Sequence, residues 1–194
     1  MGKPLLIIVN GLPGTGKTTL ARRLAADLRL PVFGRDGIYE TLYDALECQS
    51  NGLSPLIGPA TFTFLYYIAS SLLAAGQSLI VEGFFGRPEL RSAEFLQLQH
   101  AHDFEPFQIL CKTDGEVLLE RFLARAGTVE RHIGHRDRDL EFIEQNKERV
   151  LQGHLTHLAL SGQVVEIDTT TSHSFDYAAL LQRVRAALLN TLTN

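Results

Sequence analysis

The run Gly11-Leu-Pro-Gly-Thr-Gly16-Lys17-Thr18 constrains this chain most, because it matches the Walker A pattern in full. The glycines of such a loop let successive backbone N–H groups turn toward one point, where they bind a phosphate. A helix that begins near Lys17 adds its positive dipole end, and the lysine reaches the β- and γ-phosphates. The sequence therefore predicts a nucleoside triphosphate site. The predicted nucleotide-binding residues of the loop are Gly11, Pro13, Gly14, Thr15, Gly16, Lys17, Thr18 and Thr19.

The expected nucleotide is ATP. Guanine-specific proteins usually carry an Asn-Lys-x-Asp element after a strand. The candidate here, Asn146-Lys147-Glu148-Arg149, lacks the aspartate and lies within a helical pattern.

Alternating apolar runs and amphipathic stretches predict an α/β fold, with a parallel sheet covered by helices on both faces. Short apolar runs predict strands at Pro4–Val9, Pro31–Gly34, Leu79–Val81, Phe107–Cys111 and Gln163–Ile167. Helices are expected after the Walker A loop, from about Asp36, from Gly58-Pro59 to Gly76, from Pro88, from a capping box at Thr113–Glu116 to Ala126, from about Asp139 to Leu158, and from about Phe175 to Leu189.

Length and charge narrow the class of protein. A chain of 194 residues is expected to form one domain over 1–194. The formal charge of −4 argues against an extended nucleic-acid-binding face.

The charge-free stretch Cys48–Val81 contains the apolar piece Ala60–Ala75, which is shorter than the roughly 20 residues that span a bilayer, so no transmembrane helix is expected. Two cysteines without metal-ligand spacing, and no signal peptide, favour a cytoplasmic location.

Two carboxylates are placed at the ends of predicted strands. Glu82 ends the apolar run Leu79–Val81, as a Walker B acidic residue does, and together with Thr18 it is the predicted Mg²⁺ site. Asp36 follows the second strand where a helix begins, so it either caps that helix or acts as a general base toward an acceptor hydroxyl. Both roles are compatible, because the carboxyl end of a strand faces the phosphate crevice.

An arginine-rich segment follows. Arg121 and Arg125 are four residues apart on one helix, and Arg131, Arg136 and Arg138 lie in a polar stretch that we expect to be a lid over about residues 127–138. Gly127 and Gly134 would permit its movement. The arginines would stabilise charge in phosphoryl transfer; alternatively, they form a solvated surface paired with Glu120, Glu130, Asp137 and Asp139.

Two His-x-x-His pairs, His132/His135 and His154/His157, have no evident third ligand. We therefore expect lid or surface histidines rather than a metal site.

With these motifs the chain resembles bacterial P-loop kinases of the AAA-type group that contains polynucleotide-kinase-like, zeta-toxin-like and chloramphenicol-phosphotransferase-like members. The resemblance covers nearly the whole chain and rests on GLPGTGKTT, Gly34-Arg35-Asp36-Gly-Ile-Tyr-Glu40, LIVEG at 79–83, the helix Glu116–Arg125 and Arg131-His132-Ile133-Gly134-His135. It implies a P-loop NTPase three-layer sandwich with sheet order 2-3-1-4-5, Asp36 as catalytic base and adenine near Asp168–Thr171. Many relatives have proline where this chain has Ile133.

The residues and the resemblance together favour an ATP-dependent kinase that phosphorylates a hydroxyl of a small-molecule acceptor, in a monomer or homodimer. The predicted catalytic residues are Lys17, Asp36, Arg125 and Arg131, with Arg121 and Arg125 also on the nucleotide. Two alternatives remain: an ATPase or switch that acts through a protein partner, and a polynucleotide 5′-kinase with a basic channel to Asp36.

The acceptor is expected to bind within about residues 36–75 and against the loop Gly83–Arg87. The predicted acceptor-binding residues are Arg35, Asp36, Phe84, Phe85 and Arg87. Four aromatic residues, Phe62, Phe64, Tyr66 and Tyr67, cannot all face one helix stripe. Because only Arg35 and Arg87 are placed to pair with an anion, the sequence favours a neutral or weakly charged acceptor with an apolar face.

Overall fold

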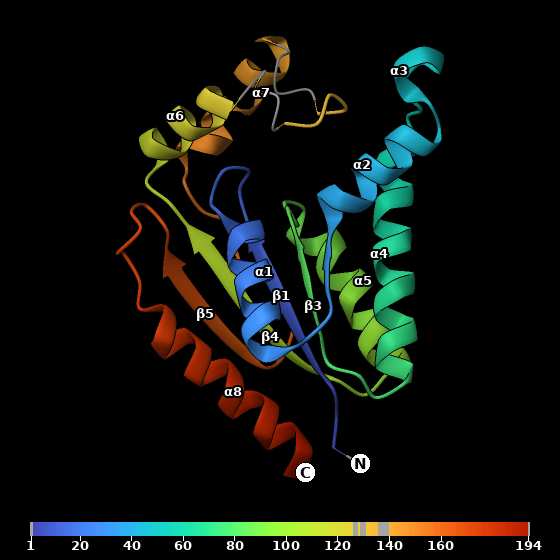
Figure 1. Cartoon of the computed structure of the whole chain (residues 1–194), viewed down its shortest axis with the longest axis vertical. Helices are drawn as coiled ribbons and strands as arrows, with labels where there is room; N and C mark the ends of the chain where they lie inside the picture. The colour runs from blue at the N-terminus through green and yellow to red at the C-terminus, as the bar shows by residue number, and fades with distance from the viewer. Residues whose placement is uncertain (1, 126–127, 129–130, 136–139, 194) are drawn as a thin grey trace.

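Five parallel strands in the order β2-β3-β1-β4-β5 form the central sheet (Figure 1). They are β1 (Leu5–Gly11), β2 (Val32–Gly34), β3 (Leu79–Gly83), β4 (Glu105–Lys112) and β5 (Gln163–Asp168). The predicted α/β class and strand order are confirmed.

The structure, a computed structural model, describes residues 2–125, 128, 131–135 and 140–193. Several residues to which the sequence assigns lid roles or ion pairs therefore lie outside the described residues: Gly127, Glu130, Arg136, Asp137, Arg138 and Asp139.

The described helices are α1 (Lys17–Leu28), α2 (Arg35–Ala45), α3 (Cys48–Asn51), α4 (Ile57–Ala74), α5 (Pro88–Ala101), α6 (Gly115–Arg125), α7 (Leu140–Leu151) and α8 (Tyr177–Thr193). The short helix α3 was not predicted. Helix α7 ends at Leu151, not at Leu158 as predicted, because Gly153 turns the chain at a positive φ of 71°. The Gly153 carbonyl then accepts a hydrogen bond from the Thr113 N–H.

The capping box expected at Thr113 is wrong in its capping residue. Asp114 Oδ1 accepts the N–H groups of Glu116 and Val117 at 3.0 and 3.1 Å, so this aspartate caps α6. The Thr113 hydroxyl instead lies 2.7 Å from the hydroxyl of Thr169. The cap is therefore one residue later than the sequence predicts, and the helix begins at Gly115.

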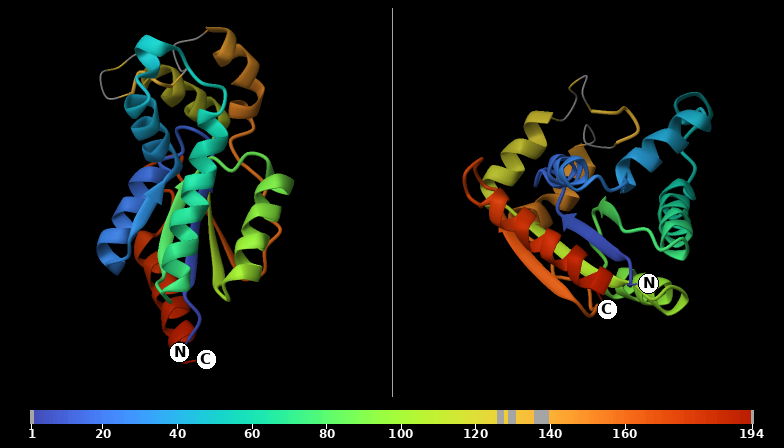
Figure 2. Two further views of the ribbon diagram at one scale, coloured as in Figure 1. Left: turned by 90° about the vertical axis from the view of Figure 1, so that its right-hand side faces the viewer. Right: turned by 60° about the horizontal axis from the view of Figure 1, so that its bottom comes forward.

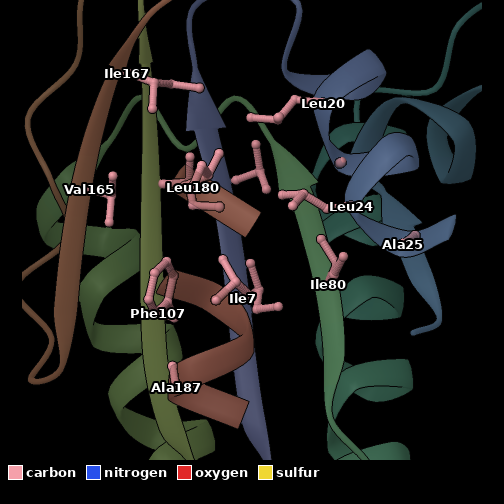
Figure 3. Packing of buried hydrophobic residues seen from close by; sticks show 14 of the residues in the cluster. Ile7, Leu20, Leu24, Ala25, Ile80, Phe107, Val165, Ile167, Leu180 and Ala187 are labelled. Carbon is pink, nitrogen blue, oxygen red and sulfur yellow. The ribbon is translucent and has the colours of Figure 1, made fainter. Parts of the chain in front are cut away.

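Helices cover both faces of the sheet (Figure 2). On one face, α1 and α8 pack on the strands through Leu20, Leu24, Leu180 and Val184, all buried (Figure 3 shows part of this cluster). On the other face, α4 and α5 pack through a second cluster, which contains Leu65, Ala69, Leu73, Phe95 and Leu98. These two layers hold the strands with their carboxyl ends at one edge.

Helices α6 and α7 lie together beyond that edge (Figure 1). A third buried cluster joins them to the Walker A loop through Leu12, Leu118 and Val150. The loop is therefore enclosed by packed side chains rather than held by its own turns alone.

Helix α4 is long and apolar enough, by length and composition, to cross a membrane. Core helices pass the same test, and 28% of that window is buried here. Leu65, Ala69 and Leu73 of this helix are buried in the cluster that packs on the sheet.

Candidate active site

The Walker A loop wraps between β1 and α1 with two glycines in the left-handed region, Gly14 at φ 94° and Gly16 at φ 75°. Residues that carry a side chain rarely adopt this backbone conformation, so the turn requires glycine at both positions. The hydroxyl and N–H of Thr15 both donate to the Leu12 carbonyl, at 2.9 and 3.2 Å. Lys17 begins α1 and is only 7% exposed. The loop thus has the backbone that a phosphate-binding nest needs.

Glu82 lies beside this loop, at the end of β3. Thr18 Oγ1 donates to Glu82 Oε1 at 3.2 Å, and the carboxylate is 3% exposed. Among the described residues, the buried Oε2 of Glu82 has no hydrogen-bond partner. Burial raises the pKa of Glu82, Lys17 opposes this, and Asp36 adds to it. A buried carboxylate oxygen without a protein partner, beside a hydroxyl, fits a Mg²⁺ ion.

A smaller cavity of about 300 Å³ opens at this position and is lined in part by Thr18, Arg22, Asp36, Glu82 and Arg131. It gives an ion and its waters room next to both carboxylates.

Asp36 is not the cap of its helix, as one interpretation of the sequence suggested. It lies in the first turn of α2, after Gly34 at the N-cap position. Its Oδ1 accepts from Arg35 Nη1 at 3.1 Å, and its Oδ2 lies 3.7 Å from Arg131 Nη1. Burial alone raises the pKa of Asp36, but the charges of Lys17 and Arg35 outweigh it and hold the pKa below its usual value. The carboxylate is therefore ionised at neutral pH.

The segment 131–135 rests on α2. Tyr39 Oη donates to the Gly134 carbonyl at 3.0 Å, and His135 Nε2 lies 2.8 Å from Glu40 Oε1. His132 Nε2 lies 3.1 Å from Asp44 Oδ1. These contacts hold the described part of the predicted lid over Asp36. Both histidines of the predicted lid pair therefore contact carboxylates of α2.

Arg121 and Arg125 lie on α6, and neither lines the cavities described here. Arg121 donates to the carbonyls of Thr169 and Thr170, at 2.9 and 2.6 Å, and so holds the loop after β5. Arg125 is half-buried as a residue, and its guanidinium carbon lies 5.4 Å from the centre of the Phe122 ring. In this structure Arg121 positions the loop near which the resemblance places adenine.

A cavity of about 770 Å³ runs from Lys17 and Asp36 toward α4 and α5. Of the predicted acceptor-binding residues, Arg35, Asp36, Phe84 and Arg87 line it. Sequence reasoning missed several other lining residues: Tyr39, Arg91, Glu94, Asn146 and Arg149.

Phe85 corrects the expectation that it faces an acceptor. Its side chain is 0% exposed and packs on Phe95 and Phe62, with ring centres 5.4 and 6.1 Å away. The Phe85 backbone N–H donates to Asn10 Oδ1 at 3.0 Å. Phe84, next to it, lines the cavity instead.

The aromatic residues of α4 divide as their spacing requires. Phe62 and Tyr66, four residues apart, line the cavity. Phe64 and Tyr67 are 48% and 69% exposed on the outer side of the helix.

This sheet order, with the Walker A loop at the end of β1 and a carboxylate at the end of β3, defines a P-loop kinase fold. The chain belongs to the AAA domain family AAA_33, which matches residues 6–150.

Relatives agree with this assignment. A proposed kinase from Chloroflexus aurantiacus has 36% identity and a TM-score of 0.81, with 98% of this chain and 99% of that chain covered. A sugar kinase from Janibacter has 16% identity and a TM-score of 0.59, with 97% and 95% covered, which supports the fold. An uncharacterised protein of Mycobacterium tuberculosis is 31% identical over 129 residues, or 63% of this chain. The match spans 26% of that longer relative.

Proposed function

We propose that this protein transfers the γ-phosphoryl group of ATP to a hydroxyl group of a small-molecule acceptor. The proposal rests on one observation: Lys17 of the phosphate loop and Asp36 line the same cavity of about 770 Å³, which reaches α4. A group at this place can contact an acceptor that lies in line with the terminal phosphate. A cavity of this size suits a small molecule.

Each described residue has a distinct role in this proposal. The loop N–H groups and Lys17 bind the phosphates, and Arg131 balances charge that develops on the transferred group. The oxygen of the acceptor hydroxyl forms a bond to the γ-phosphorus while the bond from that phosphorus to ADP breaks. Asp36 takes the proton of the hydroxyl in this step. Thr18 and Glu82 would hold Mg²⁺, which when bound neutralises phosphate charge.

The arginine pairs give Asp36 a fixed direction. Arg35 and Arg131 contact different oxygens of the carboxylate, so rotation of the group breaks at least one pair. Because Lys17 and Arg35 lower the pKa of Asp36, its carboxylate accepts a proton weakly in the ground state. Proton transfer to Asp36 is then favoured late in the reaction. By that point the bond from the acceptor oxygen to phosphorus has made the hydroxyl proton more acidic.

The test is acceptor-stimulated ADP release by purified protein, screened across nucleosides, sugars, sugar acids, aminoglycosides and oligonucleotide ends. Lys17→Ala, which removes the phosphate-binding amine, serves as the control for contaminating activity. ADP release that no acceptor stimulates, and that a protein partner alters, would favour a switch or ATPase. Stimulation by oligonucleotide ends alone would favour a polynucleotide kinase.

A further inference from the structure

The acceptor end of the large cavity carries more positive charge than the sequence led us to expect. Arg35 and Arg87 were expected there, and the structure adds Arg91 from α5 and Arg149 from α7. The carboxylates that line the same cavity are Asp36 and Glu94. In the proposed function Lys17 and Arg131 serve the nucleotide phosphates, so the remaining arginines exceed the carboxylates.

Phe62 holds two of these arginines in place. The guanidinium carbon of Arg91 lies 3.4 Å from the centre of its ring, and that of Arg35 lies 5.6 Å away. A cation on an aromatic face is attracted to the ring and keeps its N–H groups at the edge available for other partners. Arg35 also lies 4.9 Å from the centre of the Tyr39 ring, so Phe62 and Tyr39 together place it beside Arg91.

Glu94 orients Arg91 from the other side. Its Oε2 accepts from Arg91 Nη1 at 2.5 Å and from Tyr66 Oη at 2.7 Å. A guanidinium carries five N–H donors, and Arg91 gives one to Glu94 while Arg35 gives one to Asp36. Both guanidinium groups are thus fixed with donors left for a ligand.

Arg87 completes this set. It stands at the N-cap position of α5, is exposed, and forms no hydrogen bond or ion pair with any residue that the structure describes. A neutral ligand that covered these cations would remove water from them without pairing their charge. A carboxylate or phosphate would instead accept short, charge-assisted hydrogen bonds.

We propose, resting on the proposed function, that the acceptor is a small hydroxyl compound with an acidic group bound by Arg35, Arg87 and Arg91. Its hydroxyl then lies at Asp36, and its body packs against Phe62, Tyr66 and Phe84. A carboxylate and a phosphate monoester share the required chemistry. This assignment reverses the neutral acceptor that the sequence favoured, because helices α5 and α7 supply cations that the sequence did not place.

The experiment compares acceptors in matched pairs at saturating Mg·ATP, with ADP release as the readout. The carboxylate arm uses D-gluconate against D-glucitol and 4-(hydroxymethyl)benzoate against 4-(hydroxymethyl)benzamide. The phosphate arm uses glucose 6-phosphate against glucose. In at least one pair the acidic member should have a kcat/KM about tenfold or more above its neutral partner, as expected for hydrogen bonds to a charged group.

Arg87→Gln should remove most of that preference, and because Arg87 is exposed the variant should fold normally. Arg183→Gln, an exposed arginine on α8 that does not line the cavity, is the matched control and should keep the preference.

A panel in which no acidic member is preferred overturns the inference, as does a preference that Arg87→Gln leaves intact. If neutral members stimulate ADP release in that case, the proposed function stands. If no compound in the broader screen does so, the proposed function fails as well.

Discussion

A Cβ atom at Gly34 would lie 2.7 Å from Glu82 Oε1, because the two residues are partners in the pairing of β2 with β3. The buried carboxylate uses the space that a side chain on residue 34 would fill. The absence of a side chain at Gly34 therefore allows the Glu82 carboxylate to lie beside Thr18.

Gly34→Ala should displace the Glu82 carboxylate and lower the apparent affinity for Mg²⁺ by about 10- to 100-fold, the scale seen when a supporting residue of a metal site is changed. Mg²⁺ titration of ADP release measures this. The double variant Gly34→Ala/Glu82→Asp, with a shorter carboxylate, should regain part of the loss. Unchanged Mg²⁺ dependence in Gly34→Ala would show that Glu82 does not serve the ion.

Asp36→Asn should reduce acceptor phosphorylation by about 10²-fold or more, because the amide cannot take the hydroxyl proton. The binding of Mg·ATP, measured by calorimetry, should change little, since Lys17 and the loop amides remain. A near-normal turnover number in this variant would limit Asp36 to orienting Arg35 and Arg131.

His135 should make the stability of the protein depend on pH. Burial lowers its pKa, and neighbouring Arg131 lowers it further, against the raising effects of Glu40 and Asp36. A lowered pKa in the folded state means that the unfolded chain binds the proton more readily. The free energy of unfolding should therefore decrease as the pH falls below about 6.5.

Urea unfolding of the wild type and His135→Gln at pH 7.5 and 5.5 tests this. The wild type should lose more stability than the variant over that interval. Equal losses would mean that His135 titrates normally at its place between Glu40 and Tyr39.

Phe85 and Phe84 should behave differently although they are adjacent. Phe85→Ala empties a fully buried position and should cost about 3–5 kcal/mol of unfolding free energy. Phe84→Ala should change stability less but raise the KM for the acceptor, because this side chain lines the cavity. Thermal unfolding and steady-state kinetics separate the two effects, and a selective rise in acceptor KM for Phe85→Ala would contradict the buried position.

The parts of this fold that local patterns encode could be predicted from the sequence. The Walker A loop, the strand that contains Glu82 and the helix after Gly34 each depend on neighbouring residues in the chain. The side-chain direction of Phe85 could not be predicted, because its ring packs on Phe62 and Phe95, which come from helices α4 and α5 and are separated from it in the sequence.

The cavity was predicted least well for a related reason. Arg91 and Arg149 come from α5 and α7, and only the packing of α5 on the sheet and of α7 against the phosphate loop brings their charges to one cavity. The contacts of His132 and His135 with α2 also join distant parts of the sequence. The spacing of residues along the sequence does not predict these contacts between distant segments.

The central claim is that the γ-phosphoryl group passes to an acceptor hydroxyl and not to water. The most direct measurement is ³¹P NMR of the products formed with Mg·ATP and the compound that best stimulates ADP release. We expect one phosphomonoester for each ADP formed and little inorganic phosphate. Inorganic phosphate in an amount equal to ADP, with no phosphorylated acceptor, would contradict it.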